Sequence, residues 1–183
     1  TLYMVTHAAL DLLLSRWSGQ DDVVVGSPIA GRTQVGTEGL IGFFVNTLAL
    51  RIDLSGDPSF QELVRRVRET ALGAYAHQEL PFERLVEEVA PERGLSHTPL
   101  FQVMFALQNA DAGEGSAIAG LRREPFRGEV RAVRFDLELD LHEVGEELAA
   151  SLRFRTDLFD APTIERFAAQ YAAVLAAAVA LPE

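Results

Sequence analysis

The sequence of 183 residues contains no cysteine and no lysine. Without cysteine the chain has no disulfide, no thiolate nucleophile and no cysteine-ligated metal site, which fits the cytoplasmic location that we expect. All sixteen basic residues are arginine. The absence of lysine excludes Schiff-base chemistry on the protein and a phosphate-binding loop of the P-loop type.

Long hydrophobic runs are missing as well. No apolar stretch reaches the ~18 residues of a membrane span, and the N-terminal segment has no basic start and carries Asp11 and Arg16, unlike a signal peptide. The net charge is −11 and the pI about 4.8, which disfavours a nucleic-acid-binding protein because such proteins present a basic face. Hydrophobic residues still make up 48% of the chain, enough for a packed core.

Apolar residues at helical spacing predict four helices. The first runs over residues 2–17 and stops at Gly19. The second follows Asp57, which we expect as its N-cap, with Pro58 at the first helical position. A shorter helix is predicted after Pro81 and a longer one from Pro162.

Alternating or β-branched stretches predict the strands. "DDVVVGSPIAGR" is a buried strand that breaks into a loop, and "FQVMFALQ" is another. "VRFDLELDLHE" alternates strictly, which predicts a strand with one wet face, and "VGEE" turns it back into "LAASLRFR". Arg153 and Arg155 are expected to pair across this hairpin with Asp136, Glu138 or Asp140. Strands and helices mixed in this way predict an α/β sandwich.

The stretch "IGFFVNTLALRID", residues 41–53, contains one polar residue that looks misplaced. We expect a strand over the whole stretch, in which Phe44, Leu48, Leu50, Ile52 and Leu54 share one face. Asn46 has the same parity, and burying an unpaired carboxamide costs on the order of 1–3 kcal/mol. The residue therefore requires either a partner inside the fold or a wet cavity.

The four histidines do not form a site by their spacing. No two of His7, His77, His97 and His142 are close enough in sequence to suggest a shared metal. His7 is expected to be packed or at the surface, His77 to lie at a helix C-terminus, where a cation suits the dipole, and His142 to be solvated, while His97 stays undecided. There is also no G-x-S-x-G motif. The residues alone thus predict an α/β domain without a catalytic constellation.

Four stretches in order carry a family resemblance: "DDVVVGSPIAGR", "IGFFVNTLALR", "HQELPFERLVEEV" and "RGLSHTPLFQVMFALQN". Together they resemble the C-terminal half of condensation domains of nonribosomal peptide synthetases. The stretch "FRTDLFDAPTIERFAAQYAAVL" is similar to the tail of the same domains. The resemblance covers essentially the whole chain.

The resemblance implies the chloramphenicol acetyltransferase fold, with two lobes and an active-site tunnel between them. Residues 1–183 would form the C-terminal lobe, with a flexible or crossing segment around 109–130. Two carrier proteins bring a donor thioester and an acceptor amine on 4′-phosphopantetheine arms, and an amide forms. The family's signature His-His-x-x-x-Asp-Gly belongs to the N-terminal lobe, and this sequence has no adjacent histidine pair. We therefore expect no metal, no directly bound cofactor and no activity of this chain alone.

The matched residues suggest roles near the tunnel, each with a structural alternative. Asn46 would line the tunnel, or else cap a loop near the strand start. Ser27 and Pro28 would border the acceptor side, although Ser27 can also make a local turn hydrogen bond. Arg32 would contact a phosphopantetheine arm or pin its own loop. "HQELPFE" is interpreted as a structural helix start with Leu80 and Phe82 as apolar anchors.

Three functions stay open on the sequence. The first is one half of an amide-forming condensation domain, partnered by its N-terminal lobe, carrier proteins and an adenylation domain. The second is a non-catalytic condensation-like module that binds carrier proteins or recruits a tailoring enzyme. The third is a stand-alone acyltransferase of the same fold.

Overall fold

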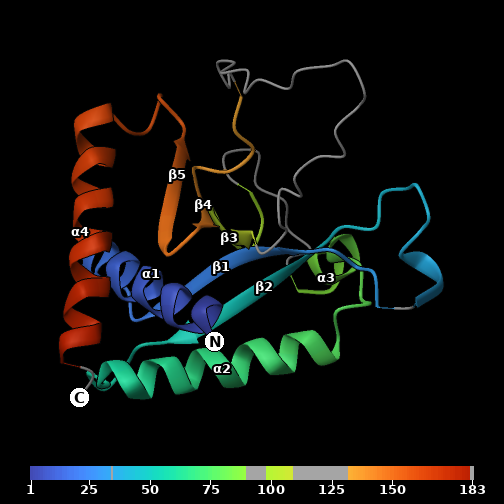
Figure 1. Cartoon of the computed structure of the whole chain (residues 1–183), viewed down its shortest axis with the longest axis horizontal. Helices are drawn as coiled ribbons and strands as arrows, with labels where there is room; N and C mark the ends of the chain where they lie inside the picture. Colours follow the sequence, from blue (N-terminus) through green and yellow to red (C-terminus); the bar gives the residue numbers. More distant parts are fainter. Residues whose placement is uncertain (34, 90–97, 109–131, 182–183) are drawn as a thin grey trace.

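The computed structural model describes residues 1–33, 35–89, 98–108 and 132–181 (Figure 1). The helices are α1 (Leu2–Ser18), α2 (Phe60–Ala76), α3 (Phe82–Val89) and α4 (Ala161–Ala180), and a 3₁₀ turn covers Val35–Thr37. The strands are β1 (Asp22–Ile29), β2 (Asn46–Asp53), β3 (Val103–Gln108), β4 (Leu137–Val144) and β5 (Glu147–Phe154).

The five strands form one mixed sheet in the order β2-β1-β3-β4-β5. The two outer pairs, β1–β2 and β4–β5, are antiparallel, whereas β1–β3 and β3–β4 are parallel. Parallel neighbours require a crossover connection, and antiparallel neighbours can be joined by a tight turn. The β4–β5 turn at Gly145 and Glu146 is such a turn, and Gly145 has a positive φ of 63°. The predicted α/β architecture with a mixed sheet is confirmed.

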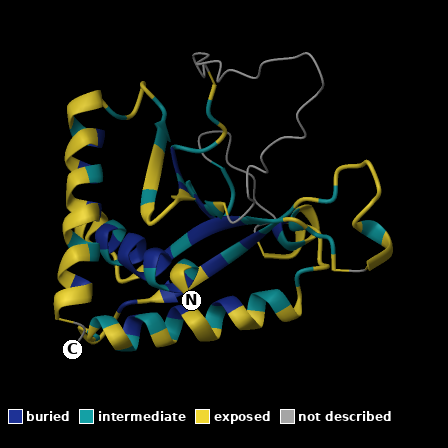
Figure 2. Cartoon of the chain, in the orientation of Figure 1, coloured by how far each residue is buried: buried dark blue, intermediate teal, exposed yellow. Residues whose placement is uncertain are grey.

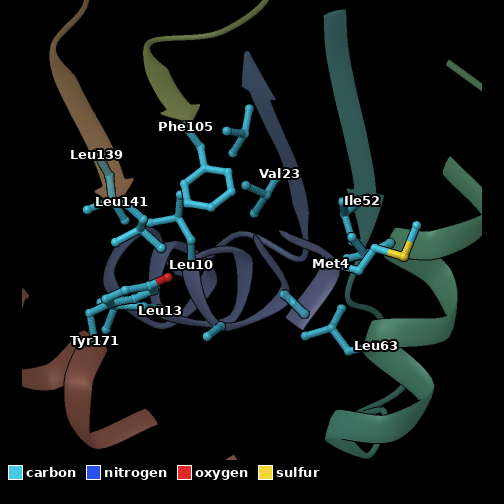
Figure 3. Packing of buried hydrophobic residues seen from close by; sticks show 14 of the residues in the cluster. Met4, Leu10, Leu13, Val23, Ile52, Leu63, Phe105, Leu139, Leu141 and Tyr171 are labelled. Carbon is cyan, nitrogen blue, oxygen red and sulfur yellow. The ribbon is translucent and has the colours of Figure 1, made fainter. Parts of the chain in front are cut away.

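Helices α1, α2 and α4 cover one face of the sheet, and the core lies between the two layers (Figure 3). Phe105 of β3 is fully buried against α1 and sits near Leu139 of β4. Tyr171 of α4 reaches into the same layer, where its hydroxyl donates to the Thr6 carbonyl at 2.9 Å. Figure 2 shows the burial concentrated on α1 and the central strands, while most of the outer side of α4 is exposed.

The predicted helix ends are confirmed except at the start of α2. Gly19 ends α1 in the left-handed conformation, with a φ of 71°, and its amide donates to the Ser15 carbonyl. The N-cap of α2 is Ser59, whose side chain accepts from the Glu62 amide, so the expectation of Asp57 was wrong. Asp57 has a φ of 49°. That conformation bends the chain two residues before the cap and leaves Pro58 outside the helix.

Two strands are shorter than their sequence patterns predict. β2 begins at Asn46 and not at Ile41, because Asn46 pairs with Ile29, the last residue of β1. β4 begins at Leu137 and not at Val133, because Leu137 is the first residue paired on both sides, with Val103 and Phe154. A β-strand needs a hydrogen-bonding neighbour, and residues beyond these registers have none among the described strands.

The polar face of β4 is less exposed than predicted. Glu138 is only 9% exposed and Asp140 is half-buried, although His142 at the strand end is exposed. The expected pairing across the hairpin is confirmed and explains the burial. Arg153 contacts both carboxylates, and Arg155 Nη1 lies 3.3 Å from Asp136 Oδ1.

Candidate functional site

A hollow of about 1040 Å³ opens on the face of the sheet away from the helices and continues past the start of β2. Four parts of the chain line it: the sheet face, described residues between Gly31 and Thr47, the turn 78–83 that joins α2 to α3, and the residues 132–135 before β4. Sheet residues in the lining are Pro28, Thr47, Met104, Ala106, Glu138, Asp140 and Arg153.

Strand alternation decides which residues reach the hollow. In β3, Met104 and Ala106 line it while Phe105 points into the helical core. In β1, Pro28 lines it while Val25 belongs to the core. The hollow is thus the second face of the same central strands that build the core.

Ser27 lies on the helix-facing side of β1. Its hydroxyl accepts from Tyr3 Oη of α1 at 2.8 Å and donates to the Phe105 carbonyl at 3.0 Å. The residue is buried, and its hydrogen-bonding capacity is used inside the lobe. Ser27 therefore does not line the hollow.

One wall of the hollow is aromatic: Phe82 and Phe135 line it, and the buried Phe101 packs against both. Phe101 lies 5.4 Å from Phe82 and 5.3 Å from Phe135 between ring centroids. Phe101 also covers Gly26, where a Cβ atom would lie 2.1 Å from its ring. Gly26 therefore has to lack a side chain for this wall to exist. Phe101 is fully buried on the hollow side of the sheet.

A second wall of the hollow is ionic. Glu138 Oε1 accepts from the Arg134 amide at 3.0 Å, and its Oε2 lies 3.2 Å from Arg153 Nε. Arg153 also donates to Asp140. Two carboxylates share one guanidinium here, so this wall can orient a polar ligand.

Arg32 holds the segment that precedes β2. Its guanidinium donates to the Thr37 carbonyl and, at 3.4 Å, to the Glu38 carbonyl, and its Cζ lies 4.3 Å from the Phe44 ring centroid. Gly31 beside it has a φ of 65°, and a Cβ there would lie 1.8 Å from the Phe44 carbonyl oxygen. In this structure the guanidinium thus makes the loop contact that was one of the two predicted alternatives.

Asn46 lines the hollow and has its carboxamide bonded to the α2–α3 turn. Nδ2 donates to the Gln78 carbonyl at 2.9 Å and to the Leu80 carbonyl at 2.8 Å. Oδ1 accepts from the Phe82 amide at 3.1 Å. The partner that the sequence argument required is thus a turn more than thirty residues away. Leu80 itself is half exposed, so it is not the buried anchor that we expected.

Along the hollow, the described lining contains no histidine, and the described residues contain no group of three or more potential metal ligands. His77 is the C-cap of α2, as predicted, and His142 is exposed at the end of β4. His97 lies outside the described residues. The hollow can bind and orient a ligand through its aromatic and ionic side chains.

Sequence reasoning missed a buried pair on the other side of the sheet. His7 Nδ1 lies 2.7 Å from Asp11 Oδ2, and neither side chain is exposed. Burial raises the pKa of the Asp11 carboxyl, and His7 opposes that rise only in part. The spacing of four residues in a predicted helix was the available signal, because it places both side chains on one helix face.

Comparison with known proteins places the chain in a family. The family model of the condensation domain matches residues 1–183. The chain belongs to the condensation domain family. It is 55% identical over 179 residues to a linear gramicidin synthase of Brevibacillus parabrevis, a match that covers 97% of this chain and 2% of that protein. It is 45% identical to the phosphinothricin tripeptide synthetase PhsB of Streptomyces viridochromogenes, covering 98% of this chain and 15% of that protein.

Solved structures of condensation domains and their relatives share the fold. A four-domain nonribosomal peptide synthetase bound to AMP and glycine matches with a TM-score of 0.91 and 27% identity, over 100% of this chain and 15% of that one. The X-domain from teicoplanin biosynthesis matches with a TM-score of 0.89 and 30% identity, over 98% of this chain and 41% of that one. The chain has the fold of one lobe of the two-lobed architecture and spans only a small part of its curated relatives.

The described helices include none that is both long and apolar enough to cross a membrane.

Proposed function

We propose that this chain is the C-terminal lobe of an amide-forming condensation domain. The complete domain joins a donor thioester on one carrier protein to an acceptor amine on another. The observation that carries this proposal is the family match over residues 1–183, together with relatives that are synthetases of peptides. The hollow supports it, since its described lining holds no histidine, and a lobe of this kind is the expected partner of a lobe that carries the catalytic histidine.

The hollow is the proposed substrate face. Pro28 and Asn46 line it, and the aromatic wall at Phe82 and Phe135 suits the apolar parts of a bound acyl or aminoacyl group. The 4′-phosphopantetheine arms of carrier proteins would enter from outside the lobe, with Arg32 at the edge of their path. An adenylation domain is the further expected neighbour. The segment 109–130, proposed to cross to the other lobe, lies outside the described residues.

An exposed apolar surface marks the proposed contact with the other lobe. The segment before β2 exposes Ile41 completely and Phe43 to 87%. Val35, Leu40 and Val45 are exposed in the same segment. A patch of this kind on a soluble domain marks an interface or leads to self-association. We propose that the N-terminal lobe covers it in the complete domain.

The decisive experiment compares the chain alone with the complete two-lobed domain. Both are given a loaded donor carrier and a loaded acceptor carrier, and the amide product is measured by mass spectrometry. We expect product from the complete domain and none above the uncatalysed rate from the chain alone. Condensation by the chain alone would overturn the assignment. A complete domain that binds both carriers and forms no amide would overturn the catalytic function.

A second candidate function follows from the likeness to the X-domain. A structure of the complex of the X-domain and OxyB from teicoplanin biosynthesis also matches this chain, with a TM-score of 0.85 and 30% identity. By analogy, the complete domain would recruit a tailoring enzyme without making a bond. Tight binding of a tailoring enzyme by a domain that forms no amide would favour this candidate.

A further inference from the structure

Asn46 uses its hydrogen bonds on its own lobe. A carboxamide has two N–H donors and one oxygen acceptor. Both N–H groups are donated to the carbonyls of Gln78 and Leu80, at 2.9 and 2.8 Å, and the oxygen accepts from the Phe82 amide at 3.1 Å. One lone pair of the oxygen is all that remains for a ligand. Direct donation from Asn46 to a substrate would therefore break the turn.

The three partners lie between and at the ends of two helices. α2 ends at Ala76 and α3 begins at Phe82. The first amides of a helix have no partner within it, so Asn46 Oδ1 serves as an N-terminal cap supplied by a distant strand. The Gln78 and Leu80 carbonyls belong to the connecting turn. Figure 1 shows α3 beside the end of β2 at which Asn46 lies.

This turn is also a wall of the hollow. Gln78, Pro81 and Phe82 all line it, and the Phe82 ring lies 5.4 Å from Phe101. Phe101 in turn packs over Gly26 of β1. The start of β2, the turn and the aromatic wall are thus joined through one side chain.

We infer that Asn46 is a positioning residue that acts on the reaction through the α2–α3 turn and its aromatic wall, and not by contact with the reacting groups. This inference rests on the proposed function, because it assigns a role within that reaction. A misplacement of about 1 Å in a binding wall can slow an enzyme about a hundredfold. The expected loss for Asn46→Ala in the complete domain is about tenfold to a hundredfold in kcat/KM.

Two variants and one control separate the possibilities. Asn46→Ala removes all three hydrogen bonds. Asn46→Asp keeps an acceptor for the Phe82 amide but sets a carboxylate oxygen against two carbonyls, so it is expected to be no better than alanine. Ser59→Ala removes the cap at the far end of α2, where the Ser59 side chain accepts from the Glu62 amide at 3.3 Å. It destabilises the same helix and leaves the turn intact.

The experiment measures two quantities on the complete domain: hydrogen exchange of the segment 77–83, and kcat/KM for amide formation well below the unfolding temperature. We expect both Asn46 variants to raise exchange in this segment and to lower kcat/KM, whereas Ser59→Ala changes neither. Slower condensation with unchanged exchange would overturn the inference in favour of direct substrate contact. Faster exchange with unchanged kinetics would overturn it in favour of a role in folding alone.

Failure of the proposed function gives a different result. A wild-type domain that forms no amide with any loaded carrier pair would overturn the proposed function and the role of Asn46 in the reaction together. The exchange measurement would still report whether Asn46 holds the turn, since that measurement needs no substrate.

Discussion

The two faces of the sheet differ in chemistry although they are built from the same strands. On the face toward the helices, Phe105, Leu139 and Leu141 are almost completely buried and pack against α1 and α4. On the other face, Met104 and Ala106 lie beside Glu138, Asp140 and Arg153, and a hollow remains. Apolar packing holds the first face, and aromatic contacts with ion pairs shape the second. We expect stability to depend mainly on the first face, and we propose that recognition uses the second.

The largest expected effect is a cavity in the helix face. Phe105→Ala should cost about 3–5 kcal/mol of unfolding free energy, because a large ring is removed from a packed core. The neighbouring Met104→Ala, on the hollow face and only half-buried, should cost clearly less. Urea unfolding followed by circular dichroism measures both, and Phe105→Leu gives a milder variant if alanine does not fold. Equal losses for Phe105→Ala and Met104→Ala would remove the distinction between the faces.

The next effect tests the aromatic wall. Gly26→Ala should destabilise the chain by about 1–3 kcal/mol, because the new Cβ would overlap the Phe101 ring. Gly73→Ala is the control, since that glycine lies in α2 with no atom within 4 Å of a new Cβ. It should stabilise the helix by about 0.5–1 kcal/mol. Thermal unfolding midpoints that shift in the same direction for both variants would contradict this account of the wall.

A pH-dependent effect follows from the buried pair on the helix face. The pKa of Asp11 is raised by burial, so the folded state holds this proton more tightly than the unfolded state, in which the pKa is about 3.9. The stability that this proton contributes is present at low pH and is lost as pH rises toward the folded pKa. Wild type should therefore lose stability relative to Asp11→Asn as pH rises above about 4, by at most about 1.4 kcal/mol per pH unit.

Asp22 provides a control of opposite sign. Its pKa is lowered by the hydrogen bonds from Arg51, so its contribution to stability is lost as pH falls. Urea unfolding of wild type, Asp11→Asn and Asp22→Asn from about pH 6 down to about pH 2.5 measures both slopes, because the Asp22 contribution is lost only below the unfolded pKa of about 3.9. A constant difference between wild type and Asp11→Asn over this range would show that the Asp11 carboxyl titrates as it does in the unfolded chain.

The smallest expected effect concerns the ion pairs of the hollow face. Arg153→Met should cost about 1 kcal/mol or less, because its guanidinium is partly solvated, and less still at high salt. The Arg51–Asp22 pair is far more exposed, so Arg51→Met should cost less than Arg153→Met. Chemical unfolding at low and at high salt tests this. A loss as large as that of Phe105→Ala would place Arg153 in the stabilising core.

Much of the fold could be predicted from local patterns. Apolar spacing located α1 and its end at Gly19, and the alternation around Leu137 and Leu139 located the hairpin and its ion pairs. The errors lie where a local pattern continues beyond its tertiary partner. Ile41 and Phe43 have a strand pattern, yet β1 ends opposite Asn46, so no described strand pairs with them. At the start of α2, Asp57 and Ser59 are both good caps, and the backbone at Asp57 selects the second.

Some residues of the hollow could be named from the sequence, but the contacts that they make could not. Pro28 and Asn46 do line the hollow, but Ser27 faces the helices, because one step along a strand reverses the direction of a side chain. Arg32 turns to its own loop, and no local signal linked Asn46 to Phe82.

The sequence by itself determined the helices, which residues of each strand share a face, and the family. These depend on residues close together in the chain and on motifs that occur in a fixed order. Only the tertiary structure decided which face of each strand meets the helices and which turn Asn46 holds. The tertiary structure also decided how far Glu138 is buried. These depend on register and on contacts between residues far apart in the chain, such as Glu138 with Arg153 and Ser27 with Phe105. Such contacts exist only once the layers have packed.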